Sequence, residues 1–555
     1  MQRAWSIAKN TLHTLRFCGI FLGKRAARSS QFLFRTIMHM FKVAHCSAVG
    51  LALCILSTLV SCVRVGSSGK FTETLPDPNV TPNATVVLDS ATGKIISTDS
   101  MTVLDSPPDH PLYVLNVTLD YENGLIHAQE RIEFLNPTRT YLEQIQFSVP
   151  PAHRAGALEF KDARIFGAKQ PLDFKLEGTV LTVKLPGSLP PDKGIAMTFD
   201  FVVKVPLQEI ASGIGGDDTS RGPLSLTAGH WYVVLPPYKE NGWDLPNYVP
   251  VGDPYTSELA DFEVNILAPE NVIIAGGGDE SRDGRLWRYS LKKARLFAFA
   301  ASPSFQVDQI EQDGITYIHY SYPQHRKVTD SLLFTAQRAV ALFSELYGPY
   351  PYKTLRIVET GRMQGQEYSA MIGIGTILYG GYPGHGAKHD LIATVVHEIS
   401  HQWWFNVVGN DQVRTPWLDE SFARMAELKF YRRYYTQLDV DWWYNYFIEN
   451  KRPPAGAIDL TIYDYPDTKA YVDAIYKRGF LFLNNLRKTI GDTAFDAAMR
   501  DYYQKESYRV TTQDAFFDAI AAKTDEDLSP LVKGYFANPV VLPCKISNTE
   551  RGCRR

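Results

Sequence analysis

The chain has 555 residues, enough for about three domains, and its 45% hydrophobic and 21% charged residues are ordinary for a globular protein. These values exclude a disordered chain and a polytopic membrane protein. The formal net charge of -3 hides an asymmetry, because residues 1–61 hold eight Lys or Arg and no acid. The remaining residues carry 49 basic and 60 acidic side chains, a net charge of about -11, which gives no electrostatic reason to expect a nucleic acid as partner.

An apolar segment, Val43–Val60, follows Lys42 and predicts a secretory signal. It ends in Leu59-Val60-Ser61-Cys62, which resembles the lipobox of bacterial lipoproteins. The resemblance implies a lipoprotein signal peptide at 40–61 and a lipid on Cys62 that anchors an exported protein to a bacterial membrane, with its catalytic part outside the cytoplasm. An uncleaved signal anchor is the alternative. Residues 1–39 form a basic extension, and a start of translation near residue 40 stays open.

Residues 62–110 are rich in Ser, Thr, Pro, Asp and Gly and predict a tether. From Tyr113 to Tyr121 apolar and polar residues alternate, which predicts a half-buried strand, and Asn123-Gly124 is typical of a tight hairpin turn. We therefore expect an antiparallel all-β domain at 111–305. Further strands are expected at 145–149, 181–185, 196–203, 262–267 and 296–300.

Helical spacing of apolar residues begins beyond Lys327. It predicts a mostly α domain at 306–540, followed by a C-terminal tail at 541–555. Cys544 and Cys553 are compatible with one disulfide in an exported protein, a pairing that the sequence leaves open. No Gly-rich stretch has the Lys and Ser/Thr of a phosphate loop, so no nucleotide is expected. The expected helices are 328–346, 390–405, 420–435, 474–490 and 512–522.

One short motif carries metal chemistry. His397-Glu398-Ile399-Ser400-His401 lies in an apolar helical run, so its spacing of four places both imidazoles on one face of a helix. This pattern is typical of zinc metallopeptidases, in which the glutamate is the general base that activates zinc-bound water. His385 and His389 have the same spacing but lie in a Gly- and Pro-rich segment without the following carboxylate, so we expect no metal there.

A catalytic zinc takes three protein ligands and leaves one position for water. Glu420, in Trp417-Leu-Asp-Glu-Ser-Phe-Ala, follows His401 after a gap of eighteen residues. Together the two motifs resemble the aminopeptidase N family of gluzincin zinc metallopeptidases (peptidase family M1), whose members include leukotriene-A hydrolase. The resemblance implies one zinc ion per chain, held by His397, His401 and Glu420, with Glu398 as the catalytic base.

Two further motifs match the family. Tyr476-Lys-Arg-Gly matches a tyrosine that donates a hydrogen bond to the oxyanion, with Tyr471 as a rival. Gly365-Gln366-Glu367-Tyr368 is a degenerate form of the family's Gly-Ala-Met-Glu-Asn strand, whose glutamate captures the ammonium group of the substrate. The resemblance thus implies that Gly365, Gln366 and Glu367 bind substrate. Glu359 is a weaker rival to Glu367.

The resemblance covers about residues 111–540 and implies a β-domain followed by a thermolysin-like α+β catalytic domain. Many relatives continue into a long helical C-terminal domain, whereas this chain stops soon after residue 540, so we expect an open site or one closed by a partner. The sequence predicts an exported, membrane-tethered zinc metallopeptidase acting on peptides, in the first place an aminopeptidase. The alternatives are a zinc endopeptidase of the same fold and a non-catalytic binding protein that retains it.

Overall fold

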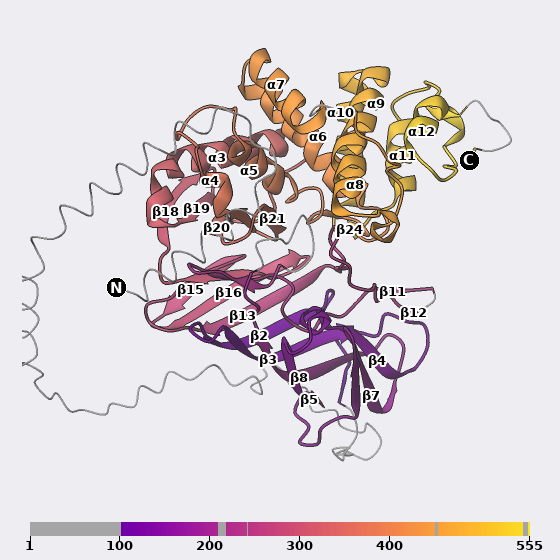
Figure 1. Cartoon of the computed structure of the whole chain (residues 1–555). Coiled ribbons are helices and arrows are strands. Elements are labelled where there is room, and N and C mark those ends of the chain that lie inside the picture. The colour runs from indigo at the N-terminus through magenta and orange to yellow at the C-terminus, as the bar shows by residue number, and fades with distance from the viewer. Residues whose placement is uncertain (1–101, 209–217, 241, 450–452, 548–552, 555) are drawn as a thin grey trace, which may run out of the picture. The chain divides into compact units, whose positions relative to one another are not determined.

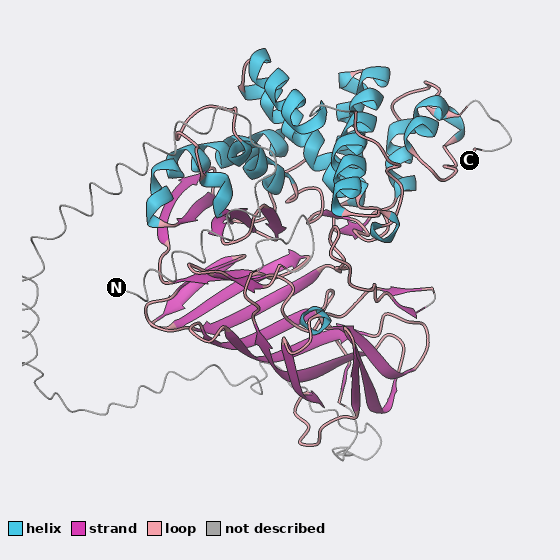
Figure 2. Cartoon of the chain, viewed as in Figure 1, coloured by secondary structure: helices cyan, strands magenta, loops and turns pink. Residues whose placement is uncertain are grey.

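The computed structural model of the chain describes residues 102–208, 218–240, 242–449, 453–547 and 553–554, which all belong to one compact unit, Glu73–Arg555. Strands predominate in the first half of this unit and helices in the second (Figures 1 and 2). The predicted signal peptide, Cys62 and most of the predicted tether lie outside the described residues. None of the described helices combines the length and the apolar character needed to span a bilayer.

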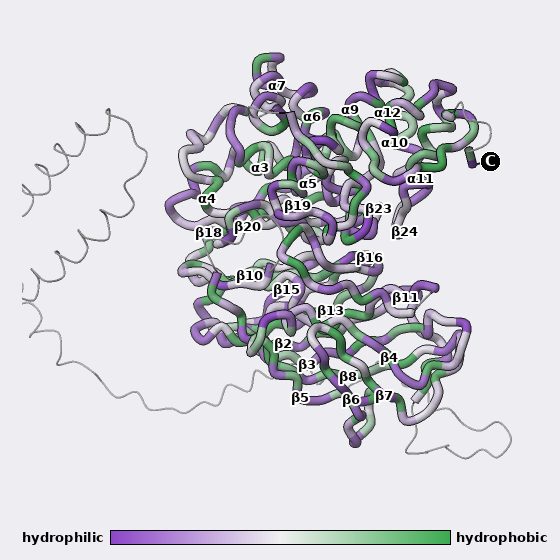
Figure 3. Tube along the Cα trace, turned by 45° about the vertical axis from the view of Figure 1, so that its right-hand side comes forward, coloured by the Kyte–Doolittle hydropathy of each residue, from purple (hydrophilic) through white to green (hydrophobic). Residues whose placement is uncertain are grey.

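An eight-stranded sheet is the main element of the β region, in the order β1-β8-β3-β2-β13-β16-β15, with β5 paired to β8. Hydrophobic and hydrophilic residues alternate along its strands (Figure 3), so that Tyr113, Leu115, Val117 and Leu119 of β2 are all buried. The strands are β1 Val103–Leu104, β2 Leu112–Asp120, β3 Leu125–Leu135, β5 Leu158–Ile165, β8 Gly194–Lys204, β13 Ala260–Leu267, β15 Asp279–Asp283 and β16 Leu286–Ala294.

Two details of the β region differ from the sequence-based expectation. Strand β13 pairs with β2 in parallel, so the sheet is mixed rather than wholly antiparallel. The strand expected at 296–300 begins only at Phe299, because side chains occupy the preceding N–H groups: those of Arg295 and Leu296 donate to Ser369 Oγ, and that of Phe297 donates to the hydroxyl of Tyr232.

Smaller sheets complete the β region. One has the order β4-β7-β6 and another the order β14-β17-β10-β9, and β11 pairs with β12. Their strands are β4 Leu142–Ser148, β6 Phe174–Glu177, β7 Val180–Leu189, β9 Ser220–Arg221, β10 Leu226–Ala228, β11 Tyr238–Lys239, β12 Gly242–Trp243, β14 Ile273–Gly276 and β17 Phe299–Ser302.

A five-stranded mixed sheet, in the order β18-β19-β20-β22-β21, begins the second half of the described chain. Strand β21 lies at its edge and pairs antiparallel with β22, so the other edge of β21 is free of sheet partners within the described residues. The strands are β18 Gln306–Gln312, β19 Ile315–Ser321, β20 Thr354–Thr360, β21 Gly365–Tyr368 and β22 Met371–Gly375, and the pair β23 Val408–Gly409 and β24 Arg509–Val510 lies farther along the chain.

Helices supply most of the remaining structure and share one large apolar core with the five-stranded sheet. The region is therefore α+β with a predominance of helix. The helices are α3 Thr329–Leu346, α4 Thr376–Tyr379, α5 Asp390–Ser400, α6 Trp417–Tyr434, α7 Gln437–Tyr444, α8 Thr468–Val472, α9 Gly479–Ile490, α10 Asp492–Glu506, α11 Gln513–Ala521 and α12 Ser529–Tyr535, with π-helical segments at Asn445–Glu449 and Asp473–Arg478. Cys544 and Cys553 are joined by a disulfide.

Helix α5 is shorter than the sequence predicted. It ends at Ser400 instead of continuing to residue 405. The N–H groups of Gln402 and Trp403 bond to carbonyl groups three residues back, which tightens the chain, and Phe405 has a φ of 127° that no α-helix accommodates. His401 nevertheless keeps helical dihedral angles as the residue that follows the helix, so both histidines of the motif stay on one face.

Candidate active site

Three side chains meet at the position that the metal motif predicts. His397 lies in the last turn of α5, His401 directly follows that helix, and Glu420 lies in the first turn of α6. Glu420 Oε2 is 3.0 Å from His397 Nε2 and 3.5 Å from His401 Nε2. One ligand atom of each residue lies within 4.8 Å of the other two, and all three side chains are buried. The structure thus brings the predicted ligand set together.

Hydrogen bonds orient both imidazole rings. His401 Nδ1 is 2.9 Å from the carbonyl oxygen of Trp404, to which it donates, so Nε2 carries the lone pair. His397 Nδ1 is 2.7 Å from Glu427 Oε1, and Glu427 is itself held by Trp443 Nε1 at 2.7 Å. Ligating histidines in proteins are fixed in this way through the nitrogen that does not bind the metal. Both Nε2 atoms therefore face Glu420 as a matched pair.

The donor set fits a zinc ion. Two imidazole nitrogens and one carboxylate are the ligands of a catalytic zinc that keeps its fourth position open. His401 Nε2 is buried without a hydrogen-bond partner among the described residues, an arrangement that a bound cation would stabilise. Burial alone would raise the pKa of Glu420, but its hydrogen bond with His397 and the nearby His401 ring outweigh burial and hold that pKa below its usual range. Glu420 is therefore a carboxylate suited to a cation.

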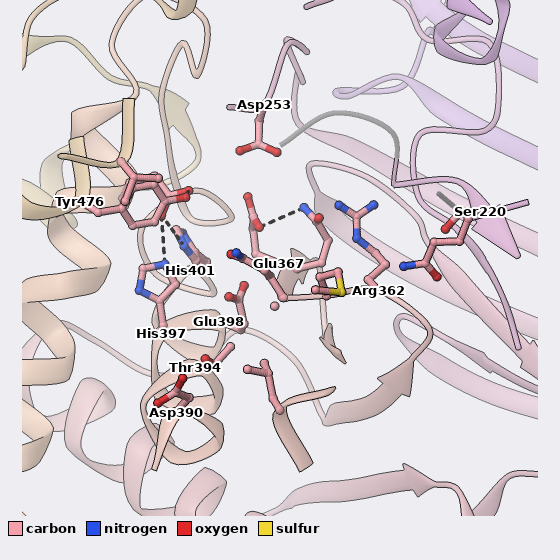
Figure 4. A pocket seen from close by; sticks show the side chains of 18 of the residues that line it. Ser220, Asp253, Arg362, Glu367, Asp390, Thr394, His397, Glu398, His401 and Tyr476 are labelled. Atoms are coloured by element: carbon pink, nitrogen blue, oxygen red, sulfur yellow. Dashed lines mark hydrogen bonds and ion pairs between the residues drawn. The ribbon is translucent and has the colours of Figure 1, made fainter. Parts of the chain in front are cut away.

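Glu398 lies beside the ligands and faces the cavity (Figure 4). Its Oε2 has no partner among the described residues, and burial raises the pKa of Glu398 to about 8. A dication held next to it would favour the carboxylate form, which can accept a proton near neutral pH. Gly365 of β21 makes room for this side chain, because a Cβ at that position would lie 2.0 Å from Glu398 Oε1.

Tyr476 lies in the π-helical segment Asp473–Arg478 and reaches the ligands from the other side. Its hydroxyl donates to Glu420 Oε1, and its ring stacks on that of His397 at 5.8 Å between centroids. Burial raises the pKa of Tyr476 well above its usual value, so the hydroxyl stays a neutral donor. The rival Tyr471 packs instead beneath Gly252, whose φ is +60° and where a Cβ would lie 2.9 Å from the Tyr471 hydroxyl. The geometry favours Tyr476.

The hairpin strand β21 carries the predicted substrate-binding residues to the same cavity. Glu367 Oε2 accepts a hydrogen bond from Gln366 Nε2 at 3.2 Å, and Oε1 accepts one from Gln412 Nε2 at 3.4 Å. Both partners are neutral amides. Burial raises the pKa of Glu367, and the nearby His401 partly opposes this shift. Glu367 thus presents a carboxylate that lacks a cationic hydrogen-bond partner within the described residues.

Asp253 is a residue that the sequence reasoning did not assign to the site. One oxygen each of Asp253, Glu367 and Glu420 lie within 4.8 Å of one another, and Figure 4 shows Asp253 facing Glu367 across the cavity. Burial raises the pKa of Asp253 well above its usual value, and Glu367 and Glu420 add to the shift. Asp253 lies within the span of the family resemblance, about residues 111–540, which assigned it no role.

Ion pairs hold the loop that carries Asp253 against the helical region. Arg414 donates to both oxygens of Asp244 at 2.7 and 3.0 Å, and Lys239 lies 2.6 Å from Asp244. Lys239 and Arg414 also reach Asp411, each at 2.7 Å. The Arg414–Asp244 and Lys239–Asp411 pairs join segments that are far apart in the sequence, so the position of this loop depends on tertiary structure.

Three other residues that the sequence raised as candidates for the site do not take part in it. Glu359 is buried and accepts hydrogen bonds from the Tyr322 amide, His325 and Thr376, so it is not available as an amine anchor. His389 caps the N-terminus of α5 by accepting a bond from the Leu391 amide. His385 is exposed. Neither histidine of this pair belongs to a potential metal cluster among the described residues.

A cavity of about 290 Å³ lies over these groups. The β region contributes to its lining through residues such as Gln208, Ser220 and Asp253, and the segment before and along β21 contributes residues 362–367. Helices α5 and α6 form the opposite wall. The cavity brings together a set of metal ligands, the carboxyl group of Glu398, the hydroxyl of Tyr476 and two further carboxyl groups. These groups suit the hydrolysis of a polar bond that lies next to a cationic group.

Comparisons with known proteins identify the helical region. Residues 336–535 match the Peptidase family M1 domain. The chain is 24% identical over 243 residues to human endoplasmic reticulum aminopeptidase 1, covering 41% of this chain and 25% of that protein. It is 27% identical over 267 residues to aminopeptidase N of Lactobacillus helveticus, covering 44% and 31%. The match spans less than a third of the length of either relative.

Solved structures show the same fold over more of the chain. The M1 zinc metallopeptidase of Deinococcus radiodurans superimposes with a TM-score of 0.55 at 16% identity, covering 80% of this chain and 97% of that structure. A mutant of that protein bound to a Tyr-Ser-Ala substrate gives a TM-score of 0.56, also at 16% identity, covering 78% and 96%. The two-part fold, a β region followed by an α+β region, is thus that of an M1 metallopeptidase.

Proposed function

Because residues 336–535 form a peptidase M1 domain, we propose that the protein is a zinc-dependent aminopeptidase that removes N-terminal residues from peptides. One observation carries the proposal: His397, His401, Glu420, Glu398 and Tyr476 surround one cavity whose other wall holds two further carboxylates. The aminopeptidase relatives and the peptide-bound Deinococcus structure support peptides as the substrate class.

The chain's own residues divide the chemistry between them. A zinc ion held by His397, His401 and Glu420 would act as a Lewis acid and lower the pKa of water. Glu398 accepts the proton of the attacking water at its unpartnered Oε2 and passes it to the leaving amine. The Tyr476 hydroxyl, which donates to Glu420 Oε1 in the structure, would turn to the oxygen of the scissile carbonyl and donate its hydrogen bond there as negative charge develops.

An excess of negative charge favours an exopeptidase over an endopeptidase. Asp253, Glu367 and Glu420 place three carboxylate oxygens within 4.8 Å of one another, and within the described residues no Lys or Arg pairs with Asp253 or Glu367. The free ammonium group of a peptide supplies the missing charge. The edge of β21 that has no sheet partner among the described residues can pair with an extended peptide whose N-terminus then lies at Glu367.

The test compares substrates that differ only at their amine. Free aminoacyl and peptide substrates should be hydrolysed far faster than their N-acetylated forms, and the purified protein should contain about one zinc per chain. Glu398→Gln should keep zinc and fold but lose nearly all turnover, because an amide does not accept the proton of water. Equal cleavage of acetylated internal peptides would establish an endopeptidase, and stoichiometric zinc without turnover would establish a binding protein.

We further propose that the enzyme is exported and anchored to a bacterial membrane through a lipid on Cys62. The sequence Leu59-Val60-Ser61-Cys62 behind an apolar segment supports this location. A Cys62→Ala variant expressed as the full chain should lose metabolic lipid labelling and membrane attachment. Unchanged attachment and unchanged size would instead indicate an uncleaved signal anchor.

A further inference from the structure

The two ends of the cavity differ in chemistry. Asp253 and Glu367 lie at one end, and Thr394 and Asp390, on the first turns of α5, lie at the other, with Glu398 between them (Figure 4). Arg424 bonds to Glu427, which in turn bonds to His397 Nδ1. Its guanidinium lies 4.8 Å from the ring centre of Phe447, the neighbour of Tyr446, whose hydroxyl donates to Asp390. Arg424 therefore belongs to the end of the cavity opposite the two acids.

The proposed function fixes the direction of a bound peptide. Its ammonium group lies at Asp253 and Glu367, and its scissile carbonyl lies near Glu398 and Tyr476. The residue that departs with the leaving amine must then extend past Glu398 toward Thr394, which lines the cavity one helical turn before His397. Arg424, one turn after Glu420 on α6, lines the same end.

The guanidinium of Arg424 is held in place but only partly used. Its Nη1 donates to both oxygens of Glu427 at 2.7 and 2.9 Å. The group lies over the rings of Phe447 and Tyr476, 4.8 and 5.6 Å from their centroids. Within the described residues its Nε and Nη2 make no hydrogen bond or ion pair, and the side chain keeps 17% of its surface exposed. A fixed guanidinium with spare donors suits a carboxylate.

We propose that Arg424 makes the enzyme selective for peptides with a carboxylate on the residue that follows the scissile bond. This carboxylate belongs either to an Asp or Glu side chain or to the free C-terminus of a dipeptide. The inference rests on the proposed function, because that function sets the direction of the peptide. Asp390 lines the same end, where its Oδ2 accepts the hydroxyl of Tyr446 at 2.9 Å, and Arg424 supplies the positive charge that a carboxylate requires.

Two pairs of substrates separate the two sources of the carboxylate. Ala-Glu-amide against Ala-Gln-amide tests the side chain, and Ala-Gly against Ala-Gly-amide tests the C-terminus. For each pair we would measure kcat/KM with the parent enzyme, and the dissociation constant with the inactive Glu398→Gln enzyme. At least one pair should favour the acid by roughly ten-fold or more, as expected for a charge-assisted hydrogen bond.

Arg424→Met should abolish that preference, and Arg424→Lys should restore part of it. Loss of Arg424 also loosens Glu427 and thereby His397, but this structural effect lowers turnover for both members of a pair and cancels in their ratio. The matched control is Arg433→Met, which removes an exposed cation from the same helix, paired with Glu345 at 2.9 Å, and should leave the ratio unchanged.

The outcomes separate this inference from the proposed function. If free-amine peptides are hydrolysed without any preference in either pair, or with a preference that survives Arg424→Met, the role of Arg424 is wrong and the aminopeptidase stands. A preference for basic residues after the scissile bond would assign the recognition to Asp390 instead and overturn the inference. If no peptide is hydrolysed, the proposed function fails, and equal dissociation constants for both members of each pair would overturn the inference as well.

Discussion

The two walls of the cavity differ in how the charges of their side chains are paired. In the ligand wall, formed by α5 and α6, the outer nitrogen of each histidine has a hydrogen-bond partner, and both oxygens of Glu420 are engaged. In the anchor wall, formed by β21 and the loop at Asp253, Glu367 has two neutral amide partners and Asp253 faces other acids. The ligand wall suits a cation that stays bound, whereas in the anchor wall Glu367 and Asp253 have no Lys or Arg partner among the described residues, so the substrate would bring the positive charge.

The largest effect should come from breaking the ligand wall. His401→Ala removes one of two imidazole ligands, so we expect zinc to be lost and turnover to fall by more than about ten-thousand-fold, the upper scale of a single general base. Elemental analysis and kcat measure the two effects. His385→Ala, which changes the exposed histidine of the second pair, should alter neither. Stoichiometric zinc in the His401→Ala protein would show that the ligand set is wrong.

The second effect concerns the tyrosine that joins the ligand wall from the π-helical segment. Tyr476→Phe should lower kcat by roughly a hundred-fold, the usual scale for one oxyanion donor, with little change in KM and full retention of zinc. Tyr471→Phe is the control, since Tyr471 packs against Gly252 and lies 6.0 Å from Tyr476 between ring centroids. A larger loss in Tyr471→Phe than in Tyr476→Phe would reverse the assignment.

The difference between the walls also explains what the sequence could predict. The ligand wall comes from two helices: the spacing of four places His397 and His401 on one face by helical geometry, whereas Glu420, on the second helix, was assigned by the family resemblance. The order of a β region before a mostly helical α+β region was likewise evident from the change in apolar period after Lys327. Short-range periodicity is enough for the histidine pair and for the order of the two regions.

Short-range periodicity could not predict how the anchor wall is assembled. Asp253 follows Asp244 along the chain, and the ion pair of Asp244 with Arg414 joins segments far apart in the sequence. The parallel pairing of β13 with β2 depends in the same way on long-range contacts. The π-helical segment around Tyr476 was missed for another reason: its apolar spacing resembles that of the α-helix that follows it.

The third prediction tests the excess charge of the anchor wall. Glu367→Gln should reduce the preference for free over acetylated amines by about a hundred-fold, because a partly desolvated ammonium group loses its nearest anion. Asp253→Asn should reduce the same preference by about ten-fold. The ratio of kcat/KM for each pair of substrates measures the effect. An unchanged ratio in both variants would show that the ammonium group binds elsewhere.

The smallest effect should come from the side chain that connects the two walls. Gln402 follows α5 and is fully buried, and its amide spans the turn between β21 and β22: Nε2 donates to the Tyr368 carbonyl at 2.9 Å, and Oε1 accepts the Ala370 amide at 3.0 Å. Ala370 has a φ of 61°, which this pair of bonds helps to hold. The position of Glu367 relative to the histidines thus depends on Gln402.

Gln402→Met keeps the volume and removes both bonds, so we expect KM for free-amine peptides to rise several-fold while kcat changes little. Gln402→Glu keeps the acceptor for the Ala370 amide and should restore part of the loss. Acetylated substrates, which do not use Glu367, are the internal control. If kcat and zinc content fall with KM unchanged, Gln402 supports the ligand wall alone, and the two walls are not connected through this side chain.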